Sequence, residues 1–151
     1  MIQCIRTNSD NEQFQQLVGE LDADLKIRDG ADHLFYSQFN KIDTIKYAIV
    51  AYENDLPVGC GAIKAYAADT MEVKRMYVLP VNRNQGIAST ILSELELWAF
   101  ELNADKLLLE TGKNQPEAIA LYSKNGYAII PNFGQYENIE NSVCFEKRLG
   151  R

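Results

Sequence analysis

Hydrophobic residues recur along this chain with two different periods, which separate helices from strands. Apolar side chains at 87, 88, 91, 92, 95, 98, 99 and 102 repeat at helical spacing, and polar or charged residues fill the opposite face. This pattern predicts one long amphipathic helix. Alternating or short continuous apolar runs predict strands at 2–6, 45–53, 58–67, 71–79, 106–110, 126–130 and 142–148.

Capping residues and apolar spacing predict three further helices. Ser9-Asp10, with Gln13 three residues later, has the form of a capping box, and a helix from about 10 to 27 is expected after it. A second helix is expected near 31–39. The third is expected at 115–124, where a proline opens the segment and glycine follows it.

The order of these elements predicts the fold class. Polar turns join the strands at 45–53, 58–67 and 71–79 as an antiparallel meander. A strand, a helix and another strand follow between residues 71 and 110, and such a crossover requires parallel pairing. We therefore expect one α/β domain over residues 1–151, built on a mixed sheet with helices on both faces.

Composition narrows the classes of protein. The chain has 151 residues, 46% hydrophobic and 24% charged, and no apolar run approaches the roughly 20 residues of a membrane span. A net charge of −6 argues against nucleic-acid binding. Cys4, Cys60 and Cys144 form no CxxC pair, and His33 is the only histidine. We therefore expect reduced thiols and no metal site, and, because the N-terminus has no signal-peptide pattern, a cytoplasmic location.

The run from Glu72 to Ala88 carries the most chemical information. A strand-like segment ends at Pro80, a short polar loop follows, and Gly86 opens the long helix. Unpaired backbone N–H groups and the positive end of the helix dipole meet at such a point, which favours an anion. Neither the G-x-G-x-x-G string of the Rossmann turn nor the P-loop string G-x-x-x-x-G-K-[ST] occurs in the chain.

The loop itself reads Arg83-x-x-Gly86-x-Ala88. This string resembles the pyrophosphate-binding signature of the GNAT superfamily of acetyl-CoA-dependent N-acyltransferases. Its setting strengthens the resemblance, because it follows a strand that ends in proline and opens a long amphipathic helix. On the loop alone, an ordinary strand–turn–helix corner explains the residues equally well.

A second motif lies at 115–127. Its helix begins with Pro116, carries apolar residues along one stripe and stops at Asn125-Gly126, which reverses the chain into the next strand. The segment resembles the family's Asn-x-x-Ala-x-x-Leu-Tyr motif followed by Gly and an aromatic residue. Gln115 stands where the family usually has Asn, and it offers the same amide one methylene further out. The resemblance extends over residues 46–130.

The resemblance implies a fold, a co-substrate and a set of binding residues. The fold would be an α/β sheet of about seven strands flanked by about four helices, with a splayed parallel pair in the middle. Acetyl-CoA would be the co-substrate, without a metal. The residues that the motifs place against it are Met76, Tyr77, Val78, Arg83, Asn84, Gln85, Gly86, Ile87, Ala88, Ser89, Gln115 and Tyr122.

In the family an amine attacks the acetyl-CoA thioester directly, which requires a base, an oxyanion donor and an acid. By resemblance Glu72 is the candidate base, and strand alternation places it on the same face as Lys74, Met76 and Val78. An exposed Glu with a pKa of about 4.3 is a poor base, so a solvated Glu at the strand edge is the competing interpretation. The resemblance makes the Met76 N–H the oxyanion donor and the Val78 backbone a support for the pantetheine arm.

Tyr122 stands at the Leu-Tyr position where the family places its acid. A phenol with a pKa of about 10 stays protonated at neutral pH and can protonate a departing thiolate. The competing interpretation is a core tyrosine with a satisfied hydroxyl. Tyr77 lies on the opposite face of its strand from Met76 and is expected to pack.

The acceptor is predicted only by class. The acidic balance favours a small cationic amine through modest steering, although an acidic surface also serves solubility. Residues 21–40, with Phe133, Tyr136, Glu137 and Glu140, are candidates for the wall of its pocket, since aromatic and acidic side chains suit an ammonium group. Two alternatives remain for the tail from Phe133 onward: it closes the sheet, or it contacts a second subunit in a homodimer.

Three functional classes remain open. We favour a small-molecule amine N-acetyltransferase. The second class is a protein acetyltransferase acting on lysine or an N-terminus, which would need an open peptide groove. The third is a non-catalytic acyl-CoA-binding module, and the presence of both Glu72 and Tyr122 argues against it.

Overall fold

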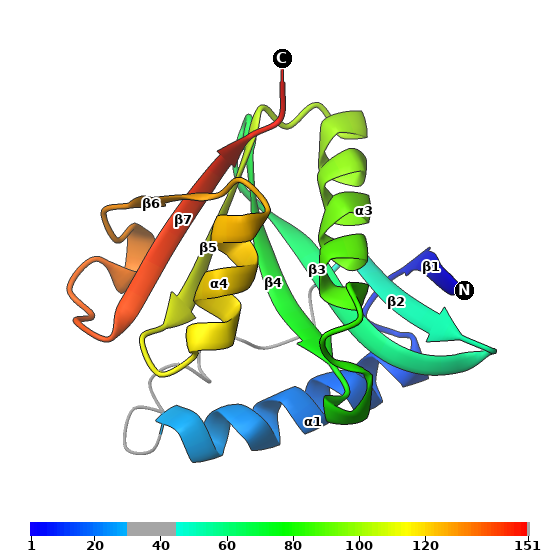
Figure 1. Cartoon of the computed structure of the whole chain (residues 1–151). Helices are drawn as coiled ribbons and strands as arrows, with labels where there is room; N and C mark the ends of the chain where they lie inside the picture. Colours follow the sequence, from blue (N-terminus) through cyan, green and yellow to red (C-terminus); the bar gives the residue numbers. More distant parts are fainter. Residues whose placement is uncertain (30–44, 151) are drawn as a thin grey trace.

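Seven strands form one mixed sheet in the order β1-β2-β3-β4-β5-β7-β6 (Figure 1). The computed structural model describes residues 1–29 and 45–150. The strands are β1 Ile2–Thr7, β2 Tyr47–Glu53, β3 Leu56–Ala67, β4 Thr70–Val78, β5 Lys106–Gly112, β6 Ala128–Ile130 and β7 Ser142–Arg148. The helices within the described residues are α1 Glu12–Asp29, α3 Ile87–Glu101 and α4 Pro116–Lys124, with short 3-10 helices η2 Pro80–Asn82 and η3 Gly134–Tyr136.

The predicted elements are confirmed within narrow limits. Every predicted strand is present, and each boundary lies within two residues of its expected position. The predicted helices at 10–27, 87–102 and 115–124 correspond to α1, α3 and α4. The helix expected at 31–39 falls outside the described residues.

The start of α1 differs from its prediction. The Oδ1 of Asn11 accepts a hydrogen bond from the Phe14 N–H at 2.9 Å, which makes Asn11 the N-cap. The capping box proposed at Ser9-Asp10 and Gln13 is therefore wrong. Asn11 directly precedes the helix and has the same kind of side-chain acceptor, so it takes the role that the more distant serine and aspartate were expected to fill.

The helices cover both faces of the sheet and produce two hydrophobic cores. On one face α1 packs against β2, β3 and β4, and its buried residues include Phe14, Leu17 and Val18. On the other face α3 buries Ile91 and Leu95 against the sheet, and α4 joins the same core. The helical periodicity of α3 was therefore a correct guide to its buried face.

The central parallel pair separates partway along its length. β4 and β5 are paired only from Thr70 to Glu72 of β4 and from Lys106 to Leu108 of β5. Beyond that point β4 stays with β3, and β5 stays with β7. A gap therefore opens between the carboxyl-terminal halves of β4 and β5, which confirms the expected splayed pair.

A β-bulge interrupts β4 just inside this gap. Lys74 is opposite Ala62 and Tyr77 is opposite Cys60, so Arg75 and Met76 face the single residue Gly61. Arg75 has a φ of 61°, in the left-handed region. The extra residue reverses the alternation of side chains along the rest of the strand.

The bulge corrects the prediction that Glu72, Lys74, Met76 and Val78 share a face. Val73 and Val78 both belong to the core under α3, and Met76 packs against it. Glu72 and Lys74 alternate with Val73 and therefore point to the α1 face. The prediction is wrong beyond Lys74, because sequence alternation cannot register an inserted residue. Tyr77 packs in the α1 core, as expected.

Cys60 and Cys144 are buried, Cys4 is partly buried, and all three are free thiols. In the described part of the chain no helix has the length and apolar character needed to cross a bilayer. Over the same residues no three His, Cys, Asp or Glu side chains are grouped so that they could hold a metal ion.

Candidate functional site

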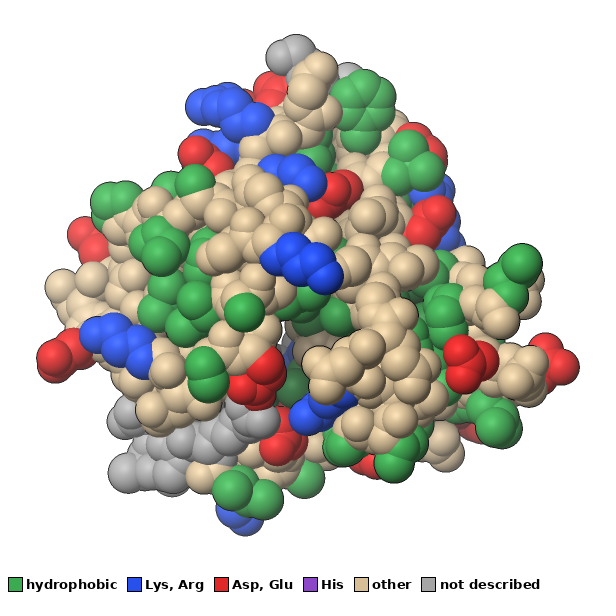
Figure 2. Space-filling model, viewed as in Figure 1, with side chains coloured by type: hydrophobic (Ala, Val, Ile, Leu, Met, Phe, Trp, Pro, Cys, Tyr) green, Lys and Arg blue, Asp and Glu red, His purple; other side chains and the backbone are tan. Residues whose placement is uncertain are grey.

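A long cleft of about 540 Å³ lies between α4, the first turn of α3 and the end of β4. The space-filling view shows the hollow between the α4 side and the N-terminal end of α3 (Figure 2). Leu21 and Asp24 of α1 close one side. The residues that line this long cleft include every predicted co-substrate residue except Gln85.

The loop before α3 has the geometry that an anion site requires. Gly86 is the N-cap of α3 with a φ of 80°, and a Cβ placed there would meet no atom within 4 Å. Ile87, Ala88 and Ser89 form the first helical turn, whose N–H groups have no partner earlier in the helix. All four residues line the long cleft, so unpaired donors and the positive end of the helix dipole lie at its wall.

Arg83 fastens this loop to the end of β4. Its Nε donates a hydrogen bond to the Val78 carbonyl at 2.9 Å, and its guanidinium lies 5.5 Å from the centre of the Tyr77 ring. The Val78 carbonyl, one of the backbone groups expected to hold the pantetheine arm, thus already accepts a bond from within the chain. Asn84, with a φ of 65°, supplies the turn of the loop.

Asn125 connects the two helices on either side of the long cleft. Its Nδ2 donates to the Ser89 Oγ at 3.1 Å and to the Leu121 carbonyl at 2.8 Å. The sequence identified Asn125 only as a helix stop, which it also is. The bond to Ser89 holds α4 against the first turn of α3.

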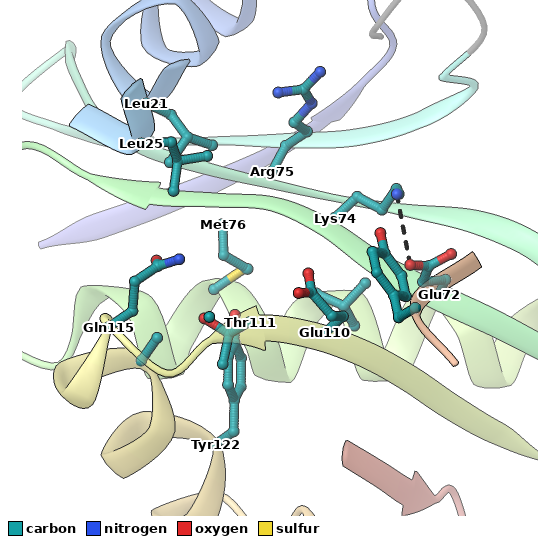
Figure 3. A pocket seen from close by; sticks show the side chains of 14 residues that line it. Leu21, Leu25, Glu72, Lys74, Arg75, Met76, Glu110, Thr111, Gln115 and Tyr122 are labelled. Atoms are coloured by element: carbon teal, nitrogen blue, oxygen red, sulfur yellow. Dashed lines mark ion pairs between the residues drawn. The ribbon is translucent and has the colours of Figure 1, made fainter. Parts of the chain in front are cut away.

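A smaller inner pocket of about 110 Å³ lies where β4 and β5 separate. It shares Leu21, Met76, Gln115, Ala118 and Tyr122 with the long cleft, so the two cavities adjoin there. Figure 3 shows Met76 pointing from β4 toward the side chains of β5 and α4, while Arg75 points the other way. The bulge is the reason for this opposition.

Tyr122 lies at the junction of the two cavities. It is 6% exposed, and its ring packs 5.8 Å from the rings of both Tyr127 and Phe145. Among the described residues no group forms a hydrogen bond with its hydroxyl, so the interpretation as a core tyrosine with a satisfied hydroxyl lacks its partner. Burial raises the pKa of Tyr122, and the charge of Glu110 raises it further. The phenol therefore stays protonated at neutral pH.

Glu72 lines the inner pocket and is buried, at 7% exposed. Its Oε2 lies 3.5 Å from the Lys74 Nζ (Figure 3). Burial raises the pKa of Glu72, and the Lys74 charge opposes that shift. Burial likewise lowers the pKa of Lys74. The interpretation of Glu72 as a solvated residue at the strand edge is wrong, because the residue is buried and is paired with β3 on one side and β5 on the other.

Sequence reasoning missed Glu110 and underrated Tyr136. Glu110 lines the inner pocket from β5, and its Oε2 accepts a hydrogen bond from the Ser142 Oγ at 2.7 Å. Tyr136 reaches the pocket from η3 and is 2% exposed. Burial raises the pKa of Tyr136, with smaller contributions from Glu110 and Glu72. One signal for Glu110 was available, since a polar residue at the carboxyl end of a parallel strand often faces a ligand crevice.

The tail and α1 supply only part of the predicted acceptor wall. Leu21 and Leu25 line the inner pocket, as does Tyr136, but Phe133, Glu137 and Glu140 do not. Phe133 instead packs its ring against two tyrosine rings. Glu140 lines a separate cavity, together with its neighbours in the same loop and Lys113. Residues 30–40 of the predicted wall lie outside the described residues.

Known proteins resemble this chain in sequence over most of its length. The model of the acetyltransferase (GNAT) family matches residues 11–127. A protein named IAA acetyltransferase from Azospirillum brasilense is 39% identical over 141 residues, which cover 89% of each chain.

Solved structures share the fold. A Klebsiella pneumoniae protein with the provisional name acyl-CoA N-acyltransferase has a TM-score of 0.84 at 29% identity, over 99% of each chain. A GNAT family acetyltransferase from Elizabethkingia anophelis, solved with acetyl-CoA bound, has a TM-score of 0.72 at 18% identity, over 97% of each chain. At 18% identity the likeness concerns the fold alone.

Proposed function

This chain belongs to the acetyltransferase (GNAT) family, and on that premise we propose that it transfers the acetyl group of acetyl-CoA directly to the primary amine of a small molecule. The observation that carries the proposal is the junction of the two cavities. Met76 and Tyr122 line both the long cleft and the inner pocket. A co-substrate in the long cleft and an acceptor in the inner pocket would meet at these two residues.

The long cleft suits acetyl-CoA at both ends. The first turn of α3 offers backbone donors to the pyrophosphate, and Gly86 leaves that approach open because it carries no Cβ. At the other end, β4 has no strand partner on the β5 side after Glu72. On that side the backbone groups of Met76 and Val78 would hold the amides of the pantetheine arm, and the Val78 carbonyl would accept through its second lone pair, because Arg83 already donates to it.

Three groups of this chain have roles in the transfer. Acetyl-CoA, when bound, supplies a thioester whose C–S bond breaks as the C–N bond of the product forms. The Met76 N–H, which lies at the bulge opposite Gly61, would hold the carbonyl oxygen. Glu72 would accept the proton of the amine, directly or through water, and its raised pKa makes it a better base than an exposed Glu. Tyr122 would give its proton to the departing sulfur.

The inner pocket supports a small acceptor. Its volume is about 110 Å³, and Leu25 of α1 and Tyr136 of η3 contribute to its walls. Glu72, paired with Lys74, lines it together with Arg75 and Glu110, and the Glu110 carboxylate on β5 supports an acceptor that arrives with a charged amine. A cytoplasmic location and a homodimer rest on the sequence alone and remain part of the proposal.

A thiol-release assay with acetyl-CoA tests the proposal. The acceptors are polyamines, amino acids, amino sugars and basic peptides. Release with a small amine is the expected result. Release with basic peptides alone would instead indicate a protein acetyltransferase. Acetyl-CoA binding without release from any acceptor would indicate a binding module and overturn the proposal.

A further inference from the structure

Arg75 lines the inner pocket, and both its backbone and its side chain are in energetically unfavourable environments. It occupies the bulge of β4 with a φ of 61°, where a residue with a Cβ is strained. Its side chain is 4% exposed, and its Nη1 lies 2.8 Å from Asp22 of α1. Within the described residues its Nε is buried without a hydrogen-bond partner. An unpaired donor on a buried guanidinium destabilises a fold, so its place beside a pocket points to a ligand.

The unpaired Nε lies on a particular edge of the guanidinium. The Nη1 is taken by Asp22, which leaves the edge formed by Nε and Nη2. Two parallel N–H groups on that edge match the two oxygens of a carboxylate, which is the usual bidentate geometry of arginine. This edge can therefore bind a carboxylate through two parallel hydrogen bonds.

Charged side chains of both signs line the inner pocket. Arg75 and Lys74 project from β4 away from Met76 (Figure 3), and Lys74 is paired with Glu72. Glu110 lies on β5 across the gap, close enough to Tyr122 for its charge to raise the pKa of the phenol. An acceptor whose amine lies beside Tyr122 and Glu110 would thus extend its other end toward Arg75.

We propose that the acceptor carries a carboxylate a few bonds from its amine and that Arg75 binds this carboxylate. The inference rests on the proposed function, because it assumes that the amine is acetylated in this pocket. It narrows the acceptor to a small amino-acid-like molecule, whose ammonium end also satisfies the expectation of a cationic group.

Matched acceptors test the inference with the wild-type protein. For alanine, leucine and phenylalanine, thiol release from acetyl-CoA is compared between the free amino acid, its carboxamide and the decarboxylated amine. We expect kcat/KM for the free acids to exceed that for the carboxamides by about tenfold or more, the worth of a charge-assisted hydrogen bond. The amine of a carboxamide is less basic and more often neutral, so its intrinsic reactivity opposes this result. Carboxamides and decarboxylated amines that match or exceed the acids would overturn the inference while leaving the proposed function intact.

An Arg75→Lys variant tests the residue itself. Lysine keeps the charge and the strained backbone but lacks the planar edge. We expect kcat/KM for the free acids to fall about tenfold, with the carboxamides changed less than about twofold. Arg6→Gln is the matched control, because Arg6 pairs with Glu101 on the surface and lines neither cavity. An equal loss for acids and carboxamides would show a merely structural role. The wild-type comparison decides the inference even if the lysine variant does not fold. No release from any amine would reject the proposed function as well.

Discussion

Replacing Tyr122 by Phe removes one oxygen atom from the junction of the two cavities and leaves the ring in place. The contacts with the rings of Tyr127 and Phe145, each at 5.8 Å, are kept. Because the hydroxyl has no hydrogen-bond partner among the described residues, its removal leaves no buried group unsatisfied. We expect the free energy of unfolding to change by less than about 1 kcal/mol.

Catalysis should change far more than stability. General acid catalysis is typically worth about 10²–10⁴-fold, or about 2.7–5.4 kcal/mol of barrier. We therefore expect kcat of Tyr122→Phe to fall within that range if chemistry limits turnover. The affinity for acetyl-CoA should change little, because the loop at 83–89 and the backbone of β4 are expected to bind it.

Three measurements on the same variant separate the interpretations. Steady-state thiol release gives kcat, calorimetry gives acetyl-CoA affinity, and thermal melting gives stability, while a pre-steady-state burst experiment shows whether product release masks the chemical step. Tyr127→Phe is the matched control, since its hydroxyl donates to the Glu96 Oε2 at 3.0 Å and lines neither cavity. That control should lose about 1 kcal/mol of stability and keep its kcat. A folded Tyr122→Phe protein with wild-type kcat and no burst would refute the role of Tyr122.

Three further predictions follow from particular residues. Gly86→Glu should abolish the acetyl-CoA binding that calorimetry detects, and Gly86→Ala should weaken it less. The control Gly19→Glu, on the exposed face of α1, should leave binding unchanged. Equal binding by all three variants would show that the loop is not part of the site. Since burial raises the pKa of Glu72, kcat/KM should rise with pH through an apparent pKa above 4.5. This rise on the acid side of the pH profile should vanish in Glu72→Gln. If it is retained in that variant, the base is another group. Gly61→Ala should cost about 1–3 kcal/mol in urea unfolding, because its Cβ would lie 2.6 Å from the Met76 Sδ; an unchanged midpoint would contradict this close packing.

The parts of the site that are contiguous in the chain were predictable. Met76, Arg83 and Gly86 line one wall of the long cleft. They lie on a strand, the loop after it and the start of the next helix, which follow one another directly in the chain. Tyr122 was predictable because a second contiguous motif carries it. Glu110 and Tyr136 were not singled out in the same way, since they reach the inner pocket from β5 and η3 through pairings that bring distant segments together.

The sequence by itself determined the elements, their order and the anion-binding corner, because hydrophobic period, turn residues and helix ends are local properties of the chain. Only the tertiary structure decided which way the β4 side chains point around the gap. Arg75 has no local feature that favours a left-handed backbone. The bulge lies opposite Gly61, whose missing Cβ leaves room for the Met76 sulfur. This long-range packing turns Met76 toward Tyr122 and Arg75 toward Asp22, and so separates the two sides of the candidate site.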